Sequence, residues 1–446
     1  MPKELFGTDG IRGVAGEYPL DPCTVFAFGE ALGADIAANR RGDEVLIGAD
    51  TRESSAWIAA TAAAGLARRG IRARYAGVIT TPGVAWLTRN GPFAAGVMIS
   101  ASHNPYQDNG IKVFGHSGFK LPDAEEHTIE QELLRLRDER LTPRQAYLQV
   151  EEDLDRQYLA YLRSTIEGRF DGIRIAVDCG NGAAFRLGPE LFQSIGADVV
   201  KVCAAPDGRN INLNCGALHP ENLSKAVTES GAACGVALDG DADRSIFVAR
   251  SGKIVNGDGV LLAAAHAWKT AGRLRGDVVV STVMANLGLE RALESEQVAM
   301  IRTPVGDKYV LEEMVRRDAV LGGEQSGHII FREYATTGDG LLTALKLFEI
   351  SRNAGLGLDE LTAGLQVYPQ KLVNIRVREK KGLLEHPAVA SEIRRAEVSF
   401  GGAGRVVVRF SGTEPVARVM VEGADAGKVD SFSASIAEVI RQQLGA

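Results

Sequence analysis

The chain has 446 residues, of which 45% are hydrophobic and 24% charged, and its formal net charge is −7. This length exceeds one ordinary core and predicts about three or four domains, while the acidic balance and the lack of a basic run argue against a nucleic-acid partner. The longest apolar run, GVLLAAAHAW, is far shorter than the roughly 20 residues of a membrane span, which argues against a membrane protein.

Strand-like apolar runs alternate with helix-like patterns along the first two thirds of the chain. The runs are EVLIGAD (44–50), AAGVMIS (94–100), IRIAVDCG (173–180), CGVALDGD (234–241) and DVVVSTV (277–283). An Ala-rich helical pattern at 56–69 follows the first of them. Near-continuous apolar strands that alternate with helices indicate parallel sheets buried on both faces. We therefore expect an α/β fold with parallel or mixed sheets.

The C-terminal part has a different pattern. The run GRVVVRFSGTEPVARVMVEG (404–423) predicts two strands around a loop, followed by a helix from about Lys428. Charged helical patterns near 123–140 and 151–165 are typical of connectors. We expect α/β domains followed by a smaller C-terminal α+β domain. Their predicted ranges are 1–155, 156–256, 257–369 and 370–446.

The five cysteines are scattered along the chain and form no C-x-x-C pair. They are Cys23, Cys179, Cys203, Cys215 and Cys234. This pattern is typical of reduced thiols rather than of a disulfide framework or a zinc site. The first residues, MPKELFGTDG, contain no apolar signal core. Both observations favour a cytoplasmic protein.

Polar clusters follow three of the buried-strand patterns, in MISASHNP, VALDGDADR and AVLGGEQSGH. In open α/β sheets, ligands bind at the carboxyl ends of the strands. Three such endings predict that three related domains face one cleft. The first cluster has two interpretations, because Ser, Asn and Pro favour a turn, whereas a hydroxyl at a strand end also suits a nucleophile.

The second cluster places Asp239, Asp241 and Asp243 at alternate positions. Three carboxylates this close repel one another unless a cation lies between them, and Mg²⁺ with oxygen ligands is usual beside phosphates. A calcium-binding EF-hand that began at Asp239 would need Gly at position 6 and Glu at position 12. Those positions hold Arg244 and Arg250, so the sequence favours magnesium over a calcium sensor.

The stretch FSGTEP (410–415) lies between Arg409 and Arg418. Hydroxyls, backbone N–H groups and two guanidiniums suit a phosphate, although a hairpin loop with flanking arginines is the simpler interpretation. No Walker A motif is present, which argues against a bound nucleotide.

The third cluster, GGEQSGH (322–328), supplies Glu324, Ser326 and His328 among glycines. These groups suit sugar hydroxyls or an amine, and a polar turn is the alternative. Arg12 in GTDGIRG and Lys112 in DNGIKVF are ordinary surface charges if each is taken alone.

The motifs TDGIRG, SASHNP, DGDADR, GEQSGH and RFSGTEP, in this order, resemble those of the α-D-phosphohexomutase superfamily. They extend over positions 7–415, so the resemblance covers nearly the whole chain. The stretches LFGTDGIRG, NINLNCGALHPE and TTGDG are most similar to its phosphoglucosamine mutase branch, which interconverts glucosamine 6-phosphate and glucosamine 1-phosphate. The resemblance implies three related α/β domains and a smaller phosphate-binding domain around a central cleft.

The resemblance also implies roles for matching residues. Ser102 matches the serine that carries the phosphoryl group, and it would complete a Mg²⁺ site formed by Asp239, Asp241 and Asp243. Arg12, His103 and Lys112 match groups around the transferring phosphoryl, and Arg244 adjoins the metal loop. Glu324, Ser326 and His328 match the sugar-contacting loop. The residues that match the clamp for the nonreacting phosphate are Arg409, Ser411, Gly412, Thr413 and Arg418. Phe410 stands where the family loop often has proline.

The implied reaction passes through glucosamine 1,6-bisphosphate, consumes no nucleotide, and would supply UDP-N-acetylglucosamine for cell-wall synthesis. The implied partner is a small sugar phosphate, and a homodimer is a further possibility. Three other interpretations remain. They are a phosphomannomutase/phosphoglucomutase, a phosphatase with Asp239 as nucleophile, and a noncatalytic sugar-phosphate binder.

Overall fold

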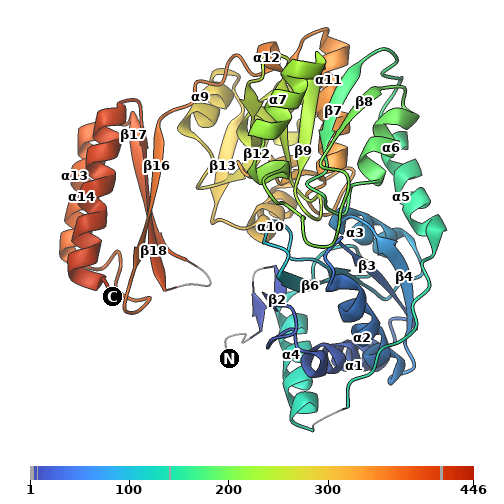
Figure 1. Ribbon diagram of the computed structural model, residues 1–446. Helices are drawn as coiled ribbons and strands as arrows, with labels where there is room; N and C mark the ends of the chain where they lie inside the picture. Colours follow the sequence, from blue (N-terminus) through green and yellow to red (C-terminus); the bar gives the residue numbers. More distant parts are fainter. Residues whose placement is uncertain (1–4, 8, 140–141, 412–414) are drawn as a thin grey trace.

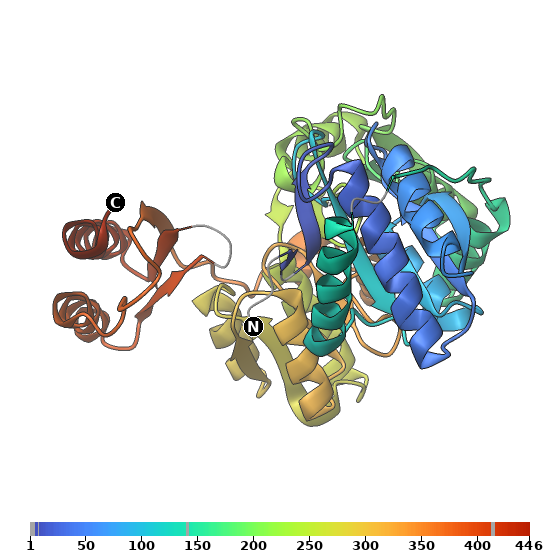
Figure 2. The same cartoon turned by 90° about the horizontal axis from the view of Figure 1, so that it is seen from below.

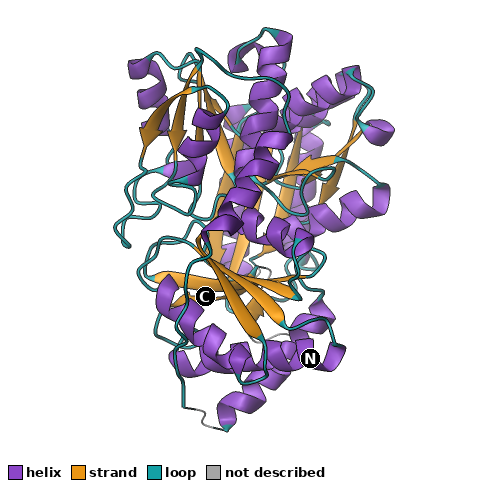
Figure 3. Cartoon of the chain, turned by 90° about the vertical axis from the view of Figure 1, so that its right-hand side faces the viewer, coloured by secondary structure: helices purple, strands orange, loops and turns teal. Residues whose placement is uncertain are grey.

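The computed structural model describes residues 5–7, 9–139, 142–411 and 415–446. Three α/β units form the main body, and a smaller C-terminal unit stands beside them (Figure 1). Figure 3 shows the strands as layers between helices. No helix of the described residues is long and apolar enough to cross a membrane.

The first sheet has six strands in the order β1-β2-β6-β5-β3-β4. Its strands are β1 (Phe6–Gly7), β2 (Gly10–Val14), β3 (Glu44–Ala49), β4 (Arg72–Val78), β5 (Ala95–Ile99) and β6 (Asp108–Gly115). Strand β3 pairs in parallel with β4 and β5, and β6 is antiparallel to β5. Helices α1 (Pro22–Asn39), α2 (Ser55–Ala67) and α4 (Asp123–Asp138) pack on one face, and α3 (Thr81–Asn90) packs on the other.

The predicted connector near 123–140 is wrong, because α4 belongs to the core of the first unit. Ile129, Leu133 and Leu136 are buried, and α4 packs against α1. Most charges of this helix lie on its outer face, although Glu130 is buried and accepts from the N–H groups of Leu5 and Phe6, and the apolar positions recur at helical spacing. Helix α5 (Glu152–Ser164) follows and packs against α3 and against α6 of the second unit.

The second and third sheets repeat the plan of the first. The second has the order β11-β10-β9-β7-β8 and the third β13-β12-β14-β15. The second unit contains β7 (Arg174–Asp178), α6 (Leu187–Ser194), β8 (Asp198–Val202), α7 (Glu221–Ser230), β9 (Cys234–Leu238), β10 (Ser245–Ala249) and β11 (Ile254–Val255). The third contains α8 (Gly257–Thr270), β12 (Val278–Thr282), α9 (Leu287–Ser295), β13 (Ala299–Thr303), α10 (Asp307–Arg317), β14 (Leu321–Gly323), β15 (Ile329–Phe331), α11 (Gly340–Ala354) and α12 (Leu358–Leu361).

Each of these sheets contains one hairpin in which a strand with a parallel neighbour is followed by an antiparallel strand. The hairpins are β5–β6, β9–β10 and β14–β15. The sheets are therefore mixed. The antiparallel strand β10 is buried along its whole length, so its sequence has the same continuous apolar pattern as a parallel strand. All three polar clusters of the sequence lie in the loops of these hairpins.

The C-terminal unit is an antiparallel sheet with the order β16-β18-β17. Its strands are β16 (Gln370–Arg376), β17 (Gly404–Phe410) and β18 (Val416–Gly423). Helices α13 (Pro387–Phe400) and α14 (Ala426–Leu444) lie together on one face (Figure 2). The predicted α+β character, the two strands and the final helix are present, and β16 and α13 complete the unit.

Arg405 and Glu422 attach this sheet to the third unit. They are partners across β17 and β18, and Arg405 Nε lies 2.7 Å from a carboxylate oxygen of Glu422. Arg405 also donates to the carbonyls of Val283 and Ala285 at 2.7 and 2.6 Å, and Glu422 accepts from the N–H of Leu287 at 2.9 Å. These contacts determine where the β17–β18 hairpin stands relative to the third sheet.

Candidate active site

The loop after β5 brings Ser102 against the loop after β9. Ser102 is buried, and its backbone φ is 52°, in the left-handed region that few residues other than glycine adopt. Its hydroxyl donates to Oδ2 of Asp239 at 2.6 Å. A serine of the first unit thus contacts the acidic cluster of the second, although 137 positions separate the two residues.

Asp239, Asp241 and Asp243 are all buried, and one oxygen from each lies within 4.8 Å of the others. Burial, followed by the nearby Asp243 and Asp241 carboxylates, raises the pKa of Asp239 well above its usual range. Among the described residues, Oδ1 of Asp241 and Oδ1 of Asp243 have no hydrogen-bond partner. Buried carboxylate oxygens without donors are suitable ligands for a hard divalent cation, so the cluster fits a magnesium ion.

Lys112 on β6 lies directly beside this cluster. Its Nζ is 2.8 Å from Asp241 and 3.3 Å from Asp243, and it is also 3.0 Å from Asp9. Burial opposes the charge, but Asp241, Asp9 and Asp243 outweigh it and raise the pKa of Lys112 well above its usual range. The Lys112 ammonium group therefore offsets part of the negative charge of the cluster.

Arg12, His103 and Arg244 lie around the Ser102 loop. Arg12 contacts the carbonyl of Ala101 at 3.4 Å and forms an ion pair with Asp9. Nη1 of Arg244 lies 3.2 Å from Nδ1 of His103, and that nitrogen is 3.3 Å from the Ser102 hydroxyl. Burial, then Arg244 and Arg12, lowers the pKa of His103 to about 4. His103 is therefore neutral at neutral pH and can accept a hydrogen bond.

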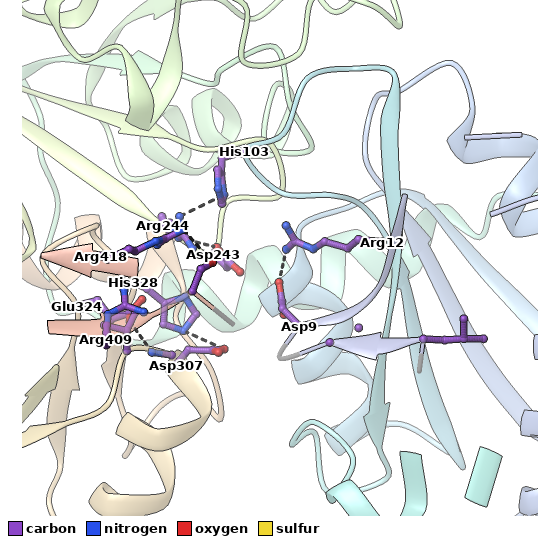
Figure 4. A pocket seen from close by; sticks show the side chains of 16 residues that line it. Asp9, Arg12, His103, Asp243, Arg244, Asp307, Glu324, His328, Arg409 and Arg418 are labelled. Atoms are coloured by element: carbon purple, nitrogen blue, oxygen red, sulfur yellow. Dashed lines mark hydrogen bonds and ion pairs between the residues drawn. The ribbon is translucent and has the colours of Figure 1, made fainter. Parts of the chain in front are cut away.

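A cavity of about 410 Å³ opens beside these residues and reaches all four units. In Figure 4, Arg12 and Asp9 project from one side of it and Arg409 and Arg418 lie on the other. This volume lies in the range of small-molecule sites. The labelled residues that line it are Asp9, Arg12, His103, Asp243, Arg244, Asp307, Glu324, His328, Arg409 and Arg418.

Glu324 and His328 in the β14–β15 loop line the middle of the cavity. Glu324 Oε1 accepts from the N–H of Gly306 at 3.2 Å, and His328 Nε2 accepts from the N–H of Gly338 at 3.0 Å. Burial opposes protonation of His328, but the Asp243 and Asp307 carboxylates, each 3.8 Å from a ring nitrogen, raise its pKa. Ser326 is exposed, donates to Glu324 at 3.4 Å, and lies outside the lining of the cavity.

Arg409, Ser411 and Arg418 line the cavity from the C-terminal unit. Arg418 Nη2 is 3.4 Å from the hydroxyl of Ser411. Burial, and then the neighbouring Arg418 charge, lowers the pKa of Arg409. Two guanidiniums in one place suit a multiply charged anion such as a phosphate. Phe410 packs against the apolar core of this unit, and Gly412 and Thr413 lie outside the described residues.

Three charged residues of the site were not anticipated from the sequence, namely Asp9, Lys120 and Asp307. Lys120 Nζ bridges Asp9 and Asp307 at 2.6 and 2.5 Å and so joins the first unit to the third. Asp9 lies inside the motif that drew attention to Arg12. Asp307 begins α10 shortly after β13, at the carboxyl end of a parallel strand, and the rule that located the other clusters would have located it as well.

Four domain families match the chain in order. Phosphoglucomutase/phosphomannomutase alpha/beta/alpha domain I matches residues 3–140, domain II matches 156–252, domain III matches 256–368, and the C-terminal domain matches 372–439. Together these four matches cover most of the chain.

Solved structures of similar proteins share the fold over the whole chain. A putative phosphomannomutase from Thermus thermophilus has a TM-score of 0.78 at 23% identity, with 99% of each chain covered. The Aspergillus fumigatus N-acetylphosphoglucosamine mutase, in complex with GlcNAc-6P and magnesium, has a TM-score of 0.65 at 19% identity, covering 99% of this chain and 96% of that one. At these identities the likeness establishes the fold.

Curated relatives are much more similar in sequence. The phosphoglucosamine mutase of Solibacter usitatus is 68% identical over 445 residues, with 100% of both chains covered. The phosphoglucosamine mutase of Koribacter versatilis is 51% identical over 456 aligned positions, with 99% of this chain and 98% of the relative covered. The chain therefore belongs to the phosphoglucosamine mutase family of the α-D-phosphohexomutase superfamily.

Proposed function

We propose that this protein interconverts glucosamine 6-phosphate and glucosamine 1-phosphate through a phosphorylated Ser102. The observation that carries the proposal is the 2.6 Å contact between the Ser102 hydroxyl and Asp239, inside a group of three buried carboxylates. Phosphoryl transfer depends on positioning and on cancellation of charge. Ser102 is buried, and its neighbour His103 lines a cavity with cationic groups at both ends, which suits a substrate with one phosphate at each end.

Asp239, Asp241 and Asp243 would hold a magnesium ion next to Ser102. When bound, such an ion would offset negative charge on the phosphoryl oxygens. The presence of magnesium in the Aspergillus fumigatus complex supports this choice of metal. Lys112 holds Asp241 and Asp243 in place through its contacts at 2.8 and 3.3 Å.

Arg12 and Arg244 would bind the phosphoryl group as it moves between Ser102 and the sugar. Both line the cavity, and Arg244 contacts His103, which lies 3.3 Å from the Ser102 hydroxyl. Neutral His103 can accept a hydrogen bond from an attacking sugar hydroxyl or from Ser102 itself. Phosphoserine brings a charge of about −1.5 to −2, which these cations and the metal would balance.

Arg409, Ser411 and Arg418 would bind the phosphate that is not reacting. Ser102 first gives its phosphoryl group to the free sugar oxygen and forms glucosamine 1,6-bisphosphate. The bisphosphate then turns within the cavity, and its other phosphate returns to Ser102. Each product leaves with one phosphate, and the enzyme regains its own. We propose that Gly412 and Thr413 belong to the same clamp.

Glu324 and His328 would recognise the sugar between the two phosphates. The Glu324 carboxylate lines the cavity and can bind sugar hydroxyls or the C2 ammonium group of glucosamine. We propose that Ser326 orients Glu324 through its 3.4 Å contact. The names of the curated relatives support glucosamine as the sugar.

A coupled assay with glucosamine, glucose and mannose phosphates tests the substrate. We expect the highest kcat/KM for glucosamine 6-phosphate. Equal or better efficiency with mannose 6-phosphate would identify a phosphomannomutase/phosphoglucomutase instead.

Incubation with a sugar 1,6-bisphosphate, followed by peptide mass spectrometry, should locate a phosphoryl group on Ser102. A phosphoryl group on Asp239 would indicate an aspartyl-phosphate phosphatase, and binding without turnover would indicate a sugar-phosphate binder.

We also propose domain boundaries near residues 155, 256 and 370, a cytoplasmic location and a homodimer. The gaps between the matched families support the boundaries. The five cysteines are free thiols, which supports a reducing compartment. Light scattering coupled to size exclusion would test the dimer.

A further inference from the structure

The backbone of Ser102 is held at both of its polar groups. Its N–H donates to Oγ of Ser100 at 2.9 Å. Its carbonyl accepts from Nη2 of Arg52 at 3.0 Å and from Nδ2 of Asn212 at 2.9 Å. A left-handed φ at a serine is strained and persists only where its surroundings enforce it. These three hydrogen bonds hold Ser102 in the left-handed conformation.

Arg52 is the centre of this arrangement. Its side chain is fully buried, and all five of its N–H donors have acceptors. Nε donates to Asp50 at 2.8 Å. The other four donate to carbonyls of the Ser102 loop, which belong to Ser102, Asn104, Pro105 and Asp108. One side chain thus determines the path of the whole loop.

Asp50 connects the two ends of the Ser102 backbone. Its Oδ2 accepts from Nε of Arg52 at 2.8 Å and from Oγ of Ser100 at 2.7 Å. The same carboxylate therefore orients the group that holds the Ser102 carbonyl and the group that holds the Ser102 N–H. Neither Asp50 nor Arg52 lines the cavity, so substrate contact does not account for this buried charge pair.

We propose that Arg52, anchored by Asp50, is a positioning residue that keeps the Ser102 oxygen aimed at Asp239 while the phosphoryl group leaves and returns. This inference rests on the proposed function, because it assumes that Ser102 is the phosphoryl carrier. In-line transfer is sensitive to small displacements of the reacting oxygen. The same oxygen is used in both half-reactions, so a loosened loop slows both.

The variant Arg52→Lys tests the proposal, since lysine keeps the charge beside Asp50 but has three donors instead of five. We expect kcat to fall about tenfold to a hundredfold in both directions, with KM changed less than about threefold. The discharge of phosphorylated enzyme in a single turnover should slow by the same factor, and the phosphorus NMR resonance of phosphoserine should shift or broaden. Arg74→Lys is the matched control, because Arg74 on β4 of the same unit pairs with Glu151 just before α5, away from the loop, and its kcat should stay within twofold.

A second variant covers the case in which Arg52→Lys does not fold. Asn212→Ala removes the donor to the same carbonyl from a loop of the second unit, and it should lower kcat about three- to tenfold with KM unchanged. If Ser102 is phosphorylated and folded Arg52→Lys has an unchanged kcat, the positioning role of Arg52 is wrong while the proposed function stands. If only Asn212→Ala folds, an unchanged kcat in that variant has the same meaning. Absence of phosphoserine in the unmodified protein would instead remove the proposed function, and the inference with it.

Discussion

Arg409 and Arg418 are direct partners across the antiparallel strands β17 and β18, and both line the cavity. Like charges in opposite positions of a sheet are destabilising, and burial adds to the cost at Arg409. A phosphate bound between the two guanidiniums would reduce this repulsion. The pairing is therefore what we expect of the proposed phosphate clamp.

Arg418→Ala should weaken the apparent affinity for both substrates without lowering the unfolding temperature. Loss of one charge-assisted hydrogen bond costs about 1.5–3 kcal/mol, which corresponds to roughly ten- to a hundredfold. Bisphosphate should escape, so added sugar bisphosphate should partly restore the rate. Kinetics in both directions measure this effect, with Arg441→Ala on the exposed face of α14 as control. A defect in one direction only, without leakage, would contradict a shared clamp.

Ser102→Ala should abolish nearly all mutase activity, because the Ser102 hydroxyl is the one that contacts Asp239 and would carry the phosphoryl group. The variant should remain folded, since the backbone contacts of residue 102 do not involve its side chain. The coupled assay and circular dichroism together measure both points. Activity equal to that of the unmodified protein would rule out Ser102 as carrier.

Asp241→Asn should reduce turnover and raise the magnesium concentration needed for half-maximal rate. Asp241 supplies an oxygen without a donor among the described residues, and an amide holds a divalent cation less well than a carboxylate does. The exposed Asp430→Asn, on α14, is the matched control. Chelation followed by metal titration measures the effect. Full activity after thorough chelation would show that the cluster does not serve as a metal site.

Asp339→Asn should change the pH dependence of stability. Burial raises the pKa of Asp339 to about 6, against about 3.9 in an unfolded chain. Between pH 4 and 6, Asp339 is therefore protonated in the folded protein and ionised in the unfolded chain. As the pH rises through this range, Asp339 lowers the free energy of unfolding. An uncharged amide has no such cost. The stability of the variant relative to the unmodified protein should therefore rise between pH 4 and 6 and then level off, by an amount on the order of 3 kcal/mol. Urea unfolding at several pH values measures it, and a constant difference would refute the argument.

Local patterns in the chain were enough to predict the α/β units, the polar loops and the acidic cluster. Asp239, Asp241 and Asp243 follow an apolar run at alternate positions, so their shared chemistry is visible without a structure. Arg52 was not anticipated, because a single arginine in a polar stretch cannot be told from a surface charge. Its role depends on carbonyls up to 56 positions away, and only the packed fold brings them together. The same limit applied to Asp9, whose partners Lys112 and Lys120 lie on another part of the chain.

The attachment of β17 and β18 at Arg405 and Glu422 has a mechanical consequence. The hairpin is anchored at this base, whereas Arg409 and Arg418 stand four residues further along the strands, which is about 13 Å at the usual rise. Arg409 and Arg418 therefore lie at the free end of the hairpin, and the fixed end is attached to the third unit. A rotation of roughly 10° about the fixed end carries the guanidiniums about 2 Å, which is enough to break a hydrogen bond to phosphate. A small rotation of one hairpin would therefore release the bisphosphate from the proposed clamp while Asp239, Asp241, Asp243 and Ser102 stay in place.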